Sequence, residues 1–226
     1  MTIDLEPLWL TLELALSTTV ILLIIGVPLA TGLAFRSFRM KSVVEAIISL
    51  PLVLPPTVLG FYFLLAFSPG NAFGKILESV FDIRLIFTFS GLILGSVIYS
   101  LPFMVHPIQA GLQGLSTSLK EASYTLGKSR TETLFKVLLP NIKPALLTGI
   151  VLSFAHTIGE FGVVLMIGGS IPGQTKVASI AIYDEVEALN YSAAHFYSFL
   201  LLLVSFTILL LVFIINKRLI RKGQLL

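Results

Sequence analysis

The sequence contains no cysteine and few charged residues. Without cysteine the chain can form no disulfide, no thiolate metal site and no cysteine nucleophile. Charged residues make up 12% of its 226 positions and hydrophobic residues 56%, with a mean hydropathy of +0.97. A soluble domain would carry about 25% charged residues. Several apolar runs also reach the roughly 20 residues that cross a bilayer as a helix. The composition therefore predicts an all-α, polytopic membrane protein.

Histidine is scarce as well, and the three copies do not cluster. His106, His156 and His195 lie on separate segments, so we expect neither a metal site nor any other cofactor. The pI of 9.2 could suggest a nucleic-acid partner, but the basic residues follow the ends of apolar runs, where membrane orientation explains them. The acidic start, MTIDLEPLW, lacks the basic segment of a cleavable signal peptide.

Five apolar runs predict five transmembrane helices in a single transmembrane domain, residues 1–226. The predicted spans cover about residues 8–35, 43–67, 85–108, 144–167 and 195–215. Residues 68–84 are expected to form a loop with a short amphipathic helix. The segment 168–194 is either a plain connector or a surface that receives a partner. No internal repeat is visible, which gives no support to a carrier built from inverted repeats.

The basic residues predict the orientation of these spans. Twelve of the fifteen lie on one side: Arg36, Arg39, Lys41, Lys120, Lys128, Arg130, Lys136, Lys143, Lys217, Arg218, Arg221 and Lys222. Loops rich in lysine and arginine stay on the cytoplasmic side of a cell membrane. We therefore expect the N-terminus outside and the C-terminus in the cytoplasm, with membrane lipid around the spans.

The longest polar interruption, residues 118–143, carries its own helix signals. Two Ser-x-x-Glu patterns, at 118–121 and 129–132, have the spacing of a capping box. Gly127 stands where a left-handed residue would end the first helix, and Pro144 suits the first turn of the next one. The segment therefore predicts a short helix, a tight turn, a second short helix and then a span.

One stretch of this segment matches a phosphate-binding motif only in part. Residues 122–129 read ASYTLGKS, close to the phosphate-binding pattern G-x-x-x-x-G-K-[ST]. The first glycine is replaced by Ala122, and a membrane span rather than a buried strand precedes the segment. A nucleotide site is therefore not expected.

A second pattern in the segment fits in full. It consists of Glu121, Ala122, Ser123, Gly127, Val137, Leu139 and Pro140. This spacing resembles the EAA coupling motif of bacterial ABC-importer permeases, written E-A-A, three residues, G, nine residues, I-x-L-P. Ser123 replaces an alanine and Val137 an isoleucine. The resemblance implies that these residues couple the spans to a cytoplasmic ATPase subunit; the alternative is a well-capped, solvent-exposed loop.

Further stretches resemble one branch of that superfamily, the molybdate-importer permeases. They are LPLVLPPTVLGFY at 50–62, IGEFGVVLMIGGSIPGQT at 158–175 and AIY at 181–183. The resemblance implies a type I ABC-importer permease fold and a homodimer that contacts two ABC ATPase subunits and an extracytoplasmic molybdate-binding protein. The cargo would be molybdate or tungstate. ATP hydrolysis would belong to the partner, so this chain is not expected to be an enzyme.

Two alternatives to this function stay open. Sulfate or thiosulfate permeases share the general layout, including the Gly-Glu-aromatic-Gly sequence of the fourth span. In a different class, the chain could be a stand-alone channel or secondary carrier whose polar segment is only a connector.

Prolines in the second span and one carboxylate in the fourth are candidates for the transport pathway and its gate. Pro51, Pro55 and Pro56 remove helical hydrogen bonds, so the span should kink or break, either to line a passage or only for packing. Glu160, flanked by Gly159 and Gly162, is the candidate in the fourth span.

The chemistry of Glu160 favours a structural or gating role. An ionised glutamate would repel an oxyanion, so it is a poor substrate ligand. Three states stay open: it is protonated, it pairs with His156, or it accepts hydrogen bonds from backbone near Gly159 and Gly162. No span interior holds a lysine or arginine that could clamp a dianion, which predicts weak binding of the cargo.

Overall fold

A computed structural model describes residues 4–223, with side chains to residue 216, and this part of the chain is helical with no strand. In chain order the helices are α1 (Glu6–Phe35), α2 (Lys41–Val53), α3 (Pro56–Phe67), α4 (Ala72–Phe81), α5 (Phe89–Gln113), α6 (Thr117–Thr125), α7 (Arg130–Thr133), the π-helical turn η1 (Leu134–Leu138), α8 (Leu139–Asn141), α9 (Lys143–Ile158), α10 (Gly162–Gly168), α11 (Ala178–Glu187) and α12 (Tyr191–Gly223). The predicted all-α class is confirmed.

Within residues 4–223, three helices are long and apolar enough to cross a membrane: α1, α5 and the part of α12 up to Asn216. Two bent pairs raise the number to five if each counts as one span. The first joins α2 and α3 at an angle of 114°, and the second joins the helical segment Arg130–Asn141 to α9 at 83°. The described chain is therefore a membrane bundle of three to five spans.

The core of the bundle lies where α1, α5 and α9 pack together. Leu22, Met104 and Ile108 are fully buried there. Glycines let the helices approach closely: a Cβ on Gly26 of α1 would lie 2.8 Å from Met104 Cγ, and one on Gly149 of α9 would lie 3.1 Å from the Met104 carbonyl oxygen. Small residues at such crossings are the usual way to pack helices tightly in a membrane.

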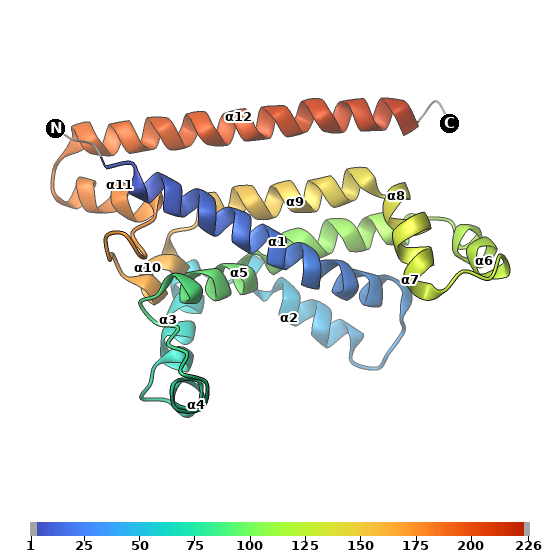
Figure 1. Ribbon diagram of the computed structural model, residues 1–226, viewed down its shortest axis with the longest axis horizontal. Coiled ribbons are helices and arrows are strands. Elements are labelled where there is room, and N and C mark those ends of the chain that lie inside the picture. Colours follow the sequence, from blue (N-terminus) through green and yellow to red (C-terminus); the bar gives the residue numbers. More distant parts are fainter. Residues whose placement is uncertain (1–3, 224–226) are drawn as a thin grey trace.

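Helix α12 lies along the edge of this bundle (Figure 1). Its large apolar side chains point outward; Phe206 is 60% exposed and Phe213 69% exposed. Such a surface would be a liability in water but matches lipid tails.

Figure 1 shows which segments share an end of the molecule. The end of α1, the helices α6 to α8 and the end of α12 lie together; the start of α1, with α10 and α11, lies at the opposite end. The predicted basic segments thus meet at one end, which we call the elbow end. The side chains of Lys217, Arg218, Arg221 and Lys222 lie outside the described part of the structure.

Several predicted boundaries need correction. The third span runs from Phe89 rather than residue 85, because the Thr88 hydroxyl caps it by accepting a hydrogen bond from Gly91 N at 3.2 Å. The fourth span, predicted at 144–167, is not continuous: α9 ends at Ile158 and α10 begins at Gly162. The expected amphipathic helix in 68–84 is confirmed as α4. Segment 168–194 contains a helix, α11, that was not predicted.

Candidate functional site

The first half of the predicted coupling region forms helix α6. We call residues 117–141, from α6 to α8, the elbow. The helix begins earlier than predicted, because the Ser116 hydroxyl caps it by accepting a hydrogen bond from Ser118 N at 3.4 Å. The predicted capping box of Ser118 and Glu121 is wrong: Ser118 is already inside the helix, and its hydroxyl lies 2.7 Å from that of Ser116.

Gly127 ends α6 as predicted, in the left-handed conformation with φ +76°. Two hydrogen bonds close the turn: Lys128 N donates to the Ser123 carbonyl at 3.2 Å, and Gly127 N donates to the Tyr124 carbonyl at 2.9 Å. This pair of bonds is the Schellman motif, which needs a residue that tolerates positive φ. Among the described residues, no atom beyond the two chain neighbours lies within 4 Å of where a Gly127 Cβ would be, so backbone conformation rather than space favours glycine here.

The second predicted capping box is confirmed at the start of α7. Glu132 N donates to the Ser129 hydroxyl at 3.2 Å, and Ser129 N donates to the Glu132 carboxylate at 3.4 Å. The Lys136 ammonium also donates to Glu132 at 2.8 Å. This hydrogen bond, together with that from Ser129 N, lowers the pKa of Glu132 below its usual 4.5. The turn between the two elbow helices is thus defined by satisfied polar groups.

Ser123 holds the two halves of the elbow together. It is buried, and its hydroxyl hydrogen-bonds to that of Thr133 at 2.8 Å. The position where the EAA motif has its second alanine therefore faces the second elbow helix, not the solvent. Leu138 and Ile142, 4% and 3% exposed, then anchor the elbow in the core beside α5. A force on the elbow would pass through them to the spans.

The exposed residues of the elbow are those able to meet another molecule. Of the predicted coupling residues, the structure leaves Glu121, Ala122, Gly127 and Pro140 exposed and Val137 and Leu139 partly buried. Two apolar side chains that the sequence reading passed over are more prominent: Leu126 is 77% exposed and Phe135 is 60% exposed. Large apolar residues in a polar, basic segment were the signal that could have found them.

The second predicted site, which we call the junction, lies where two helix breaks meet, at residues 54–55 and 159–161. Leu54 and Pro55 are extended, with ψ of 138° and 137°, and α3 starts again at Pro56. Two consecutive prolines remove two donors and force the preceding residue out of the helical region. The predicted break is confirmed there, whereas α2 continues through Pro51, which is buried within it.

The break between α9 and α10 contacts the start of α3. A Cβ on Gly162 would lie 2.8 Å from Pro56 Cβ and 3.2 Å from Thr57 N. A Cβ on Gly60 would lie 2.7 Å from Met166 Cβ and 3.1 Å from the Gly162 carbonyl oxygen. The two broken helices therefore touch through backbone, a contact that any side chain at 60 or 162 would obstruct.

A cavity of about 440 Å³ opens at this junction. Of the predicted pathway residues it brings together Pro56, Gly159, Glu160 and Gly162, but not Pro51 or Pro55. Its other lining residues are Thr57, Tyr99, Ala155, His156 and Phe161. None of these nine described residues is a lysine or arginine, so the wall has little to hold a dianion firmly. Irregular backbone at membrane depth is tolerated where it lines such a cavity.

Glu160 is 4% exposed, and neither of its carboxyl oxygens has a hydrogen-bond partner within residues 4–216. The Ser96 hydroxyl lies nearby, but it too makes no hydrogen bond there. The hypothesis of a Glu160–His156 pair is wrong, because neither Glu160 oxygen has a partner in this part of the chain, while His156 Nδ1 lies 2.9 Å from the Ser100 hydroxyl. The expected hydrogen bonds from freed backbone to the carboxyl are likewise not made.

The chain that carries these two features, a capped elbow and a junction of broken helices, also matches the model of one known family. Residues 23–222 match the model of the family described as binding-protein-dependent transport system inner membrane component. The chain belongs to this family. Its members are membrane components of transport systems, which accounts for an apolar bundle with a protruding elbow.

Relatives within this transport family are similar over nearly the whole chain. The molybdenum transport system permease protein ModB of Azotobacter vinelandii is 45% identical over 206 residues, covering 91% of each chain. The sulfate transport system permease protein CysT of Salmonella typhimurium is 34% identical, covering 89% of this chain and 71% of the relative. The fold matches that of a chain in inward-facing structures of the MetNI methionine ABC transporter, with a TM-score of 0.74, 18% identity and 96% of both chains covered.

The junction also contains residues of this transport protein that sequence reasoning did not select. Tyr99 and Phe103 enclose the His156 ring, with centroids 4.7 Å and 4.1 Å away. The sequence offers His156 as a partner for Glu160 and gives no sign of its aromatic neighbours. Tyr99 belongs to a third helix, α5, and no local pattern in the sequence connects it to either break.

Proposed function

We propose that this chain is the membrane-spanning permease subunit of an ATP-driven importer for molybdate, with tungstate as a second cargo. The observation that carries the proposal is the 45% identity to a molybdenum transport permease across 91% of both chains. The sulfate permease is less similar and extends well beyond this chain, which covers 71% of it.

In this proposal the ATPase subunits move the elbow, and the elbow transmits this movement to the junction. Two cytoplasmic ABC ATPase subunits dock on the exposed elbow residues, with Leu126 and Phe135 as apolar contacts. When ATP binding closes the ATPases, Leu138 and Ile142 transmit the displacement to α5 and α9, and the α9–α10 break shifts against α3. A binding protein delivers the anion at the opposite end, and hydrolysis in the partner subunit resets the passage.

The cargo is tested by uptake into proteoliposomes that hold the complete complex with its ATPase and binding protein. ATP-dependent accumulation of molybdate, competed by tungstate and not by excess sulfate, is the expected result. Preferential accumulation of sulfate or thiosulfate would instead assign the chain to the CysT-like permeases.

The same proteoliposomes separate an importer from a free-standing channel or carrier. Without the ATPase subunits, or with ATP withheld, we expect no accumulation. Uptake by this chain alone would overturn the proposed mechanism, whichever anion is carried.

The proposed orientation places the elbow and the C-terminus in the cytoplasm and the start of α1 outside. Because the chain has no natural cysteine, single cysteines report accessibility without background. In intact cells, a membrane-impermeant maleimide should label Ser170→Cys, near α11, but not Leu126→Cys on the elbow. The reverse labelling would invert the topology and remove the elbow from the ATPase.

We also propose that two copies enclose one passage. One chain leaves the junction uncovered on one side, where Val53 is 81% exposed beside the α2–α3 break. Under mild oxidation Val53→Cys should form a covalent dimer, whereas Phe213→Cys, on the lipid-facing edge, should not. A monomeric molecule in both cases would contradict the dimer.

A further inference from the structure

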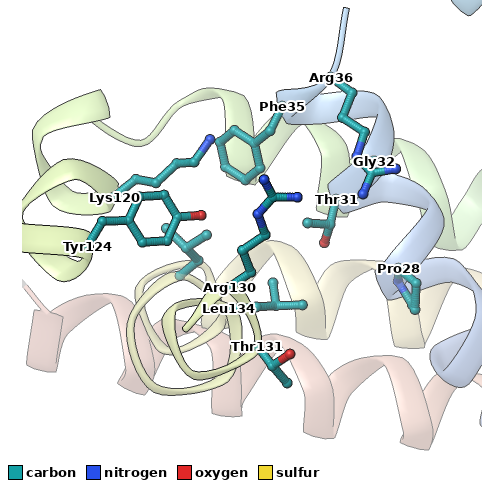
Figure 2. A pocket seen from close by; sticks show the side chains of 11 residues that line it. Pro28, Thr31, Gly32, Phe35, Arg36, Lys120, Tyr124, Arg130, Thr131 and Leu134 are labelled. Carbon is teal, nitrogen blue, oxygen red and sulfur yellow. The ribbon is translucent and has the colours of Figure 1, made fainter. Parts of the chain in front are cut away.

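A second cavity, of about 570 Å³, lies beside the elbow rather than at the junction. Figure 2 shows it between the last turns of α1 and the elbow helices α6 and α7. Its lining consists of Pro28, Thr31, Gly32, Phe35, Arg36, Lys120, Tyr124, Arg130, Thr131, Leu134 and Leu138. None of these residues belongs to the predicted coupling motif or to the junction.

Three cationic side chains reach into this cavity from three elements (Figure 2): Arg36 after α1, Lys120 on α6 and Arg130 on α7. Within residues 4–216 the ion pairs are Lys41–Glu45, Lys136–Glu132 and Lys176–Asp184, so none of the three is paired there. No carboxylate belongs to the described lining. Glu121 lines an adjoining cavity, which shares Phe35, Lys120, Tyr124 and Leu138 with this one.

The position of Lys120 is fixed by aromatic rings. Its ammonium lies 4.5 Å from the centroid of the Phe35 ring and 6.0 Å from that of Tyr124. These cation–π contacts hold the charge at the wall of the cavity. The lysine is therefore held beside Phe35 of α1 instead of extending into solvent.

Three positive charges at one cavity repel one another unless an anion lies between them. Guanidinium groups present planar pairs of N–H donors that match the oxygens of a phosphate, and an ammonium adds a third charge-assisted donor. A carboxylate carries a single charge on two oxygens, whereas a phosphate spreads its charge over more oxygens and can face donors from three directions. The donor set thus favours a tetrahedral oxyanion with several free oxygens.

The depth of the cavity points to an anion attached to an apolar tail. Pro28 lies seven residues before the end of α1, about 10 Å into the span, and Leu134 and Leu138 add apolar wall. A mostly apolar groove on the other side of the same turns includes Leu29, Leu33, Phe38 and Val44 and shares Pro28, Gly32 and Arg36 with the cavity. In the described chain, no atom beyond the adjacent residues and the backbone of α1 lies within 4 Å of where a Gly32 Cβ would be, so no side chain fills the space at this shared position.

We propose that Arg36, Lys120 and Arg130 form a binding site for a phosphate-type oxyanion, carried by an anionic phospholipid or free in solution. The adjoining apolar groove favours the phospholipid. The bound anion bridges α1 to both helices of the elbow and so ties the elbow to the membrane surface. Any consequence of this binding for transport rests on the proposed function, but the binding itself does not.

The test compares two double variants that remove the same charge from the same end of the molecule. R36Q/R130Q removes both arginines of the cavity. R39Q/K143Q, the control, alters exposed cations that line neither the cavity nor the groove. Each protein is placed in phosphatidylcholine nanodiscs with or without phosphatidylglycerol, and retained lipid is measured by native mass spectrometry. In a second arm, inorganic phosphate and molybdate are titrated calorimetrically in phosphatidylcholine alone.

For the natural sequence and the control we expect phosphatidylglycerol to be enriched over phosphatidylcholine. For R36Q/R130Q we expect the retained phosphatidylglycerol to fall about tenfold or more, since two charge-assisted contacts are removed. A third result is that no protein enriches phosphatidylglycerol, while free phosphate or molybdate binds to the natural sequence and not to R36Q/R130Q. This result would support the oxyanion site and show that its ligand comes from solution. Equal retention by both double variants would overturn the proposal.

Discussion

The elbow and the junction differ in whether their polar groups have hydrogen-bond partners. In the elbow, Ser129, Glu132 and Lys136 satisfy one another, and Ser123 is hydrogen-bonded to Thr133. In the junction, the Glu160 carboxyl is buried with no partner in the described chain. The first arrangement makes a small rigid body at the surface. The second leaves an energetic cost in the bundle interior, and a buried ionisable group of this kind is a candidate for function.

The two regions also use glycine for different reasons. Gly127 in the elbow is required by a left-handed backbone angle, with open space around it. Gly162 in the junction is required by close contact between backbones. A substitution at each position therefore tests a different property: local conformation in the elbow and movement between packed segments in the junction.

The largest effect is expected for Gly162→Leu. The new side chain would collide with Pro56 and Thr57, and overpacking of this kind costs about 1–3 kcal/mol or more. We expect a lower thermal midpoint in detergent and loss of uptake. Gly114→Ala is the control, because its new Cβ would stay 3.5 Å or more from its neighbours. Unchanged uptake by Gly162→Leu would show that the contact between the breaks is not needed.

Glu160→Leu should separate stability from transport. Since it removes two buried oxygens without partners, the free energy of unfolding should stay equal or rise by about 1–3 kcal/mol. Uptake should nevertheless fall if the carboxyl has the predicted gating role. Denaturant unfolding and uptake are measured on the same preparation. A large loss of stability would instead mean that Glu160 is a structural group.

Gly127→Val should uncouple ATP hydrolysis in the partner subunits from uptake. A β-branched residue at φ +76° costs about 1–2 kcal/mol, which distorts the turn between the elbow helices. ATP hydrolysis by the assembled complex should persist while uptake per ATP falls several-fold, and thermal stability should change little. Gly127→Asn is the matched variant, since asparagine tolerates this conformation and should keep most of the coupling. Equal losses in both would point to a side-chain clash with the ATPase.

The smallest effect concerns the pH dependence of the Glu132 cap. The pKa of Glu132 is lowered in the folded chain, mainly by Lys136, so its contribution is present above the unfolded value of about 4.5. That contribution is lost as pH falls through the folded value. Glu132→Gln should therefore unfold slightly earlier than the natural chain at neutral pH, and the difference should vanish in acid. A difference in thermal midpoint that persists in acid would contradict this origin.

Local signals predicted the elbow better than the junction. The capping box at 129–132 and the left-handed Gly127 depend on residues within a few positions of each other, so the sequence shows them directly. The error at Ser118 is also local: Ser116 was available two residues earlier and took the cap. The breaks at Pro55 and after Gly159 follow from residue chemistry too, although the fourth span was expected to continue through residue 167.

The sequence by itself determined the membrane class, the distribution of the basic segments between the ends of the spans and the helix breaks at Pro55 and Gly127, because hydropathy, charge and backbone restrictions are properties of neighbouring residues. Only the tertiary structure decided that the break after Gly159 contacts Pro56, that His156 turns to Ser100 rather than Glu160, and that Arg36, Lys120 and Arg130 share one cavity. Apart from Lys120 and Arg130, which are ten positions apart, these pairings join residues from 56 to more than 100 positions apart. No sequence period encodes them, since they arise only when separate helices pack.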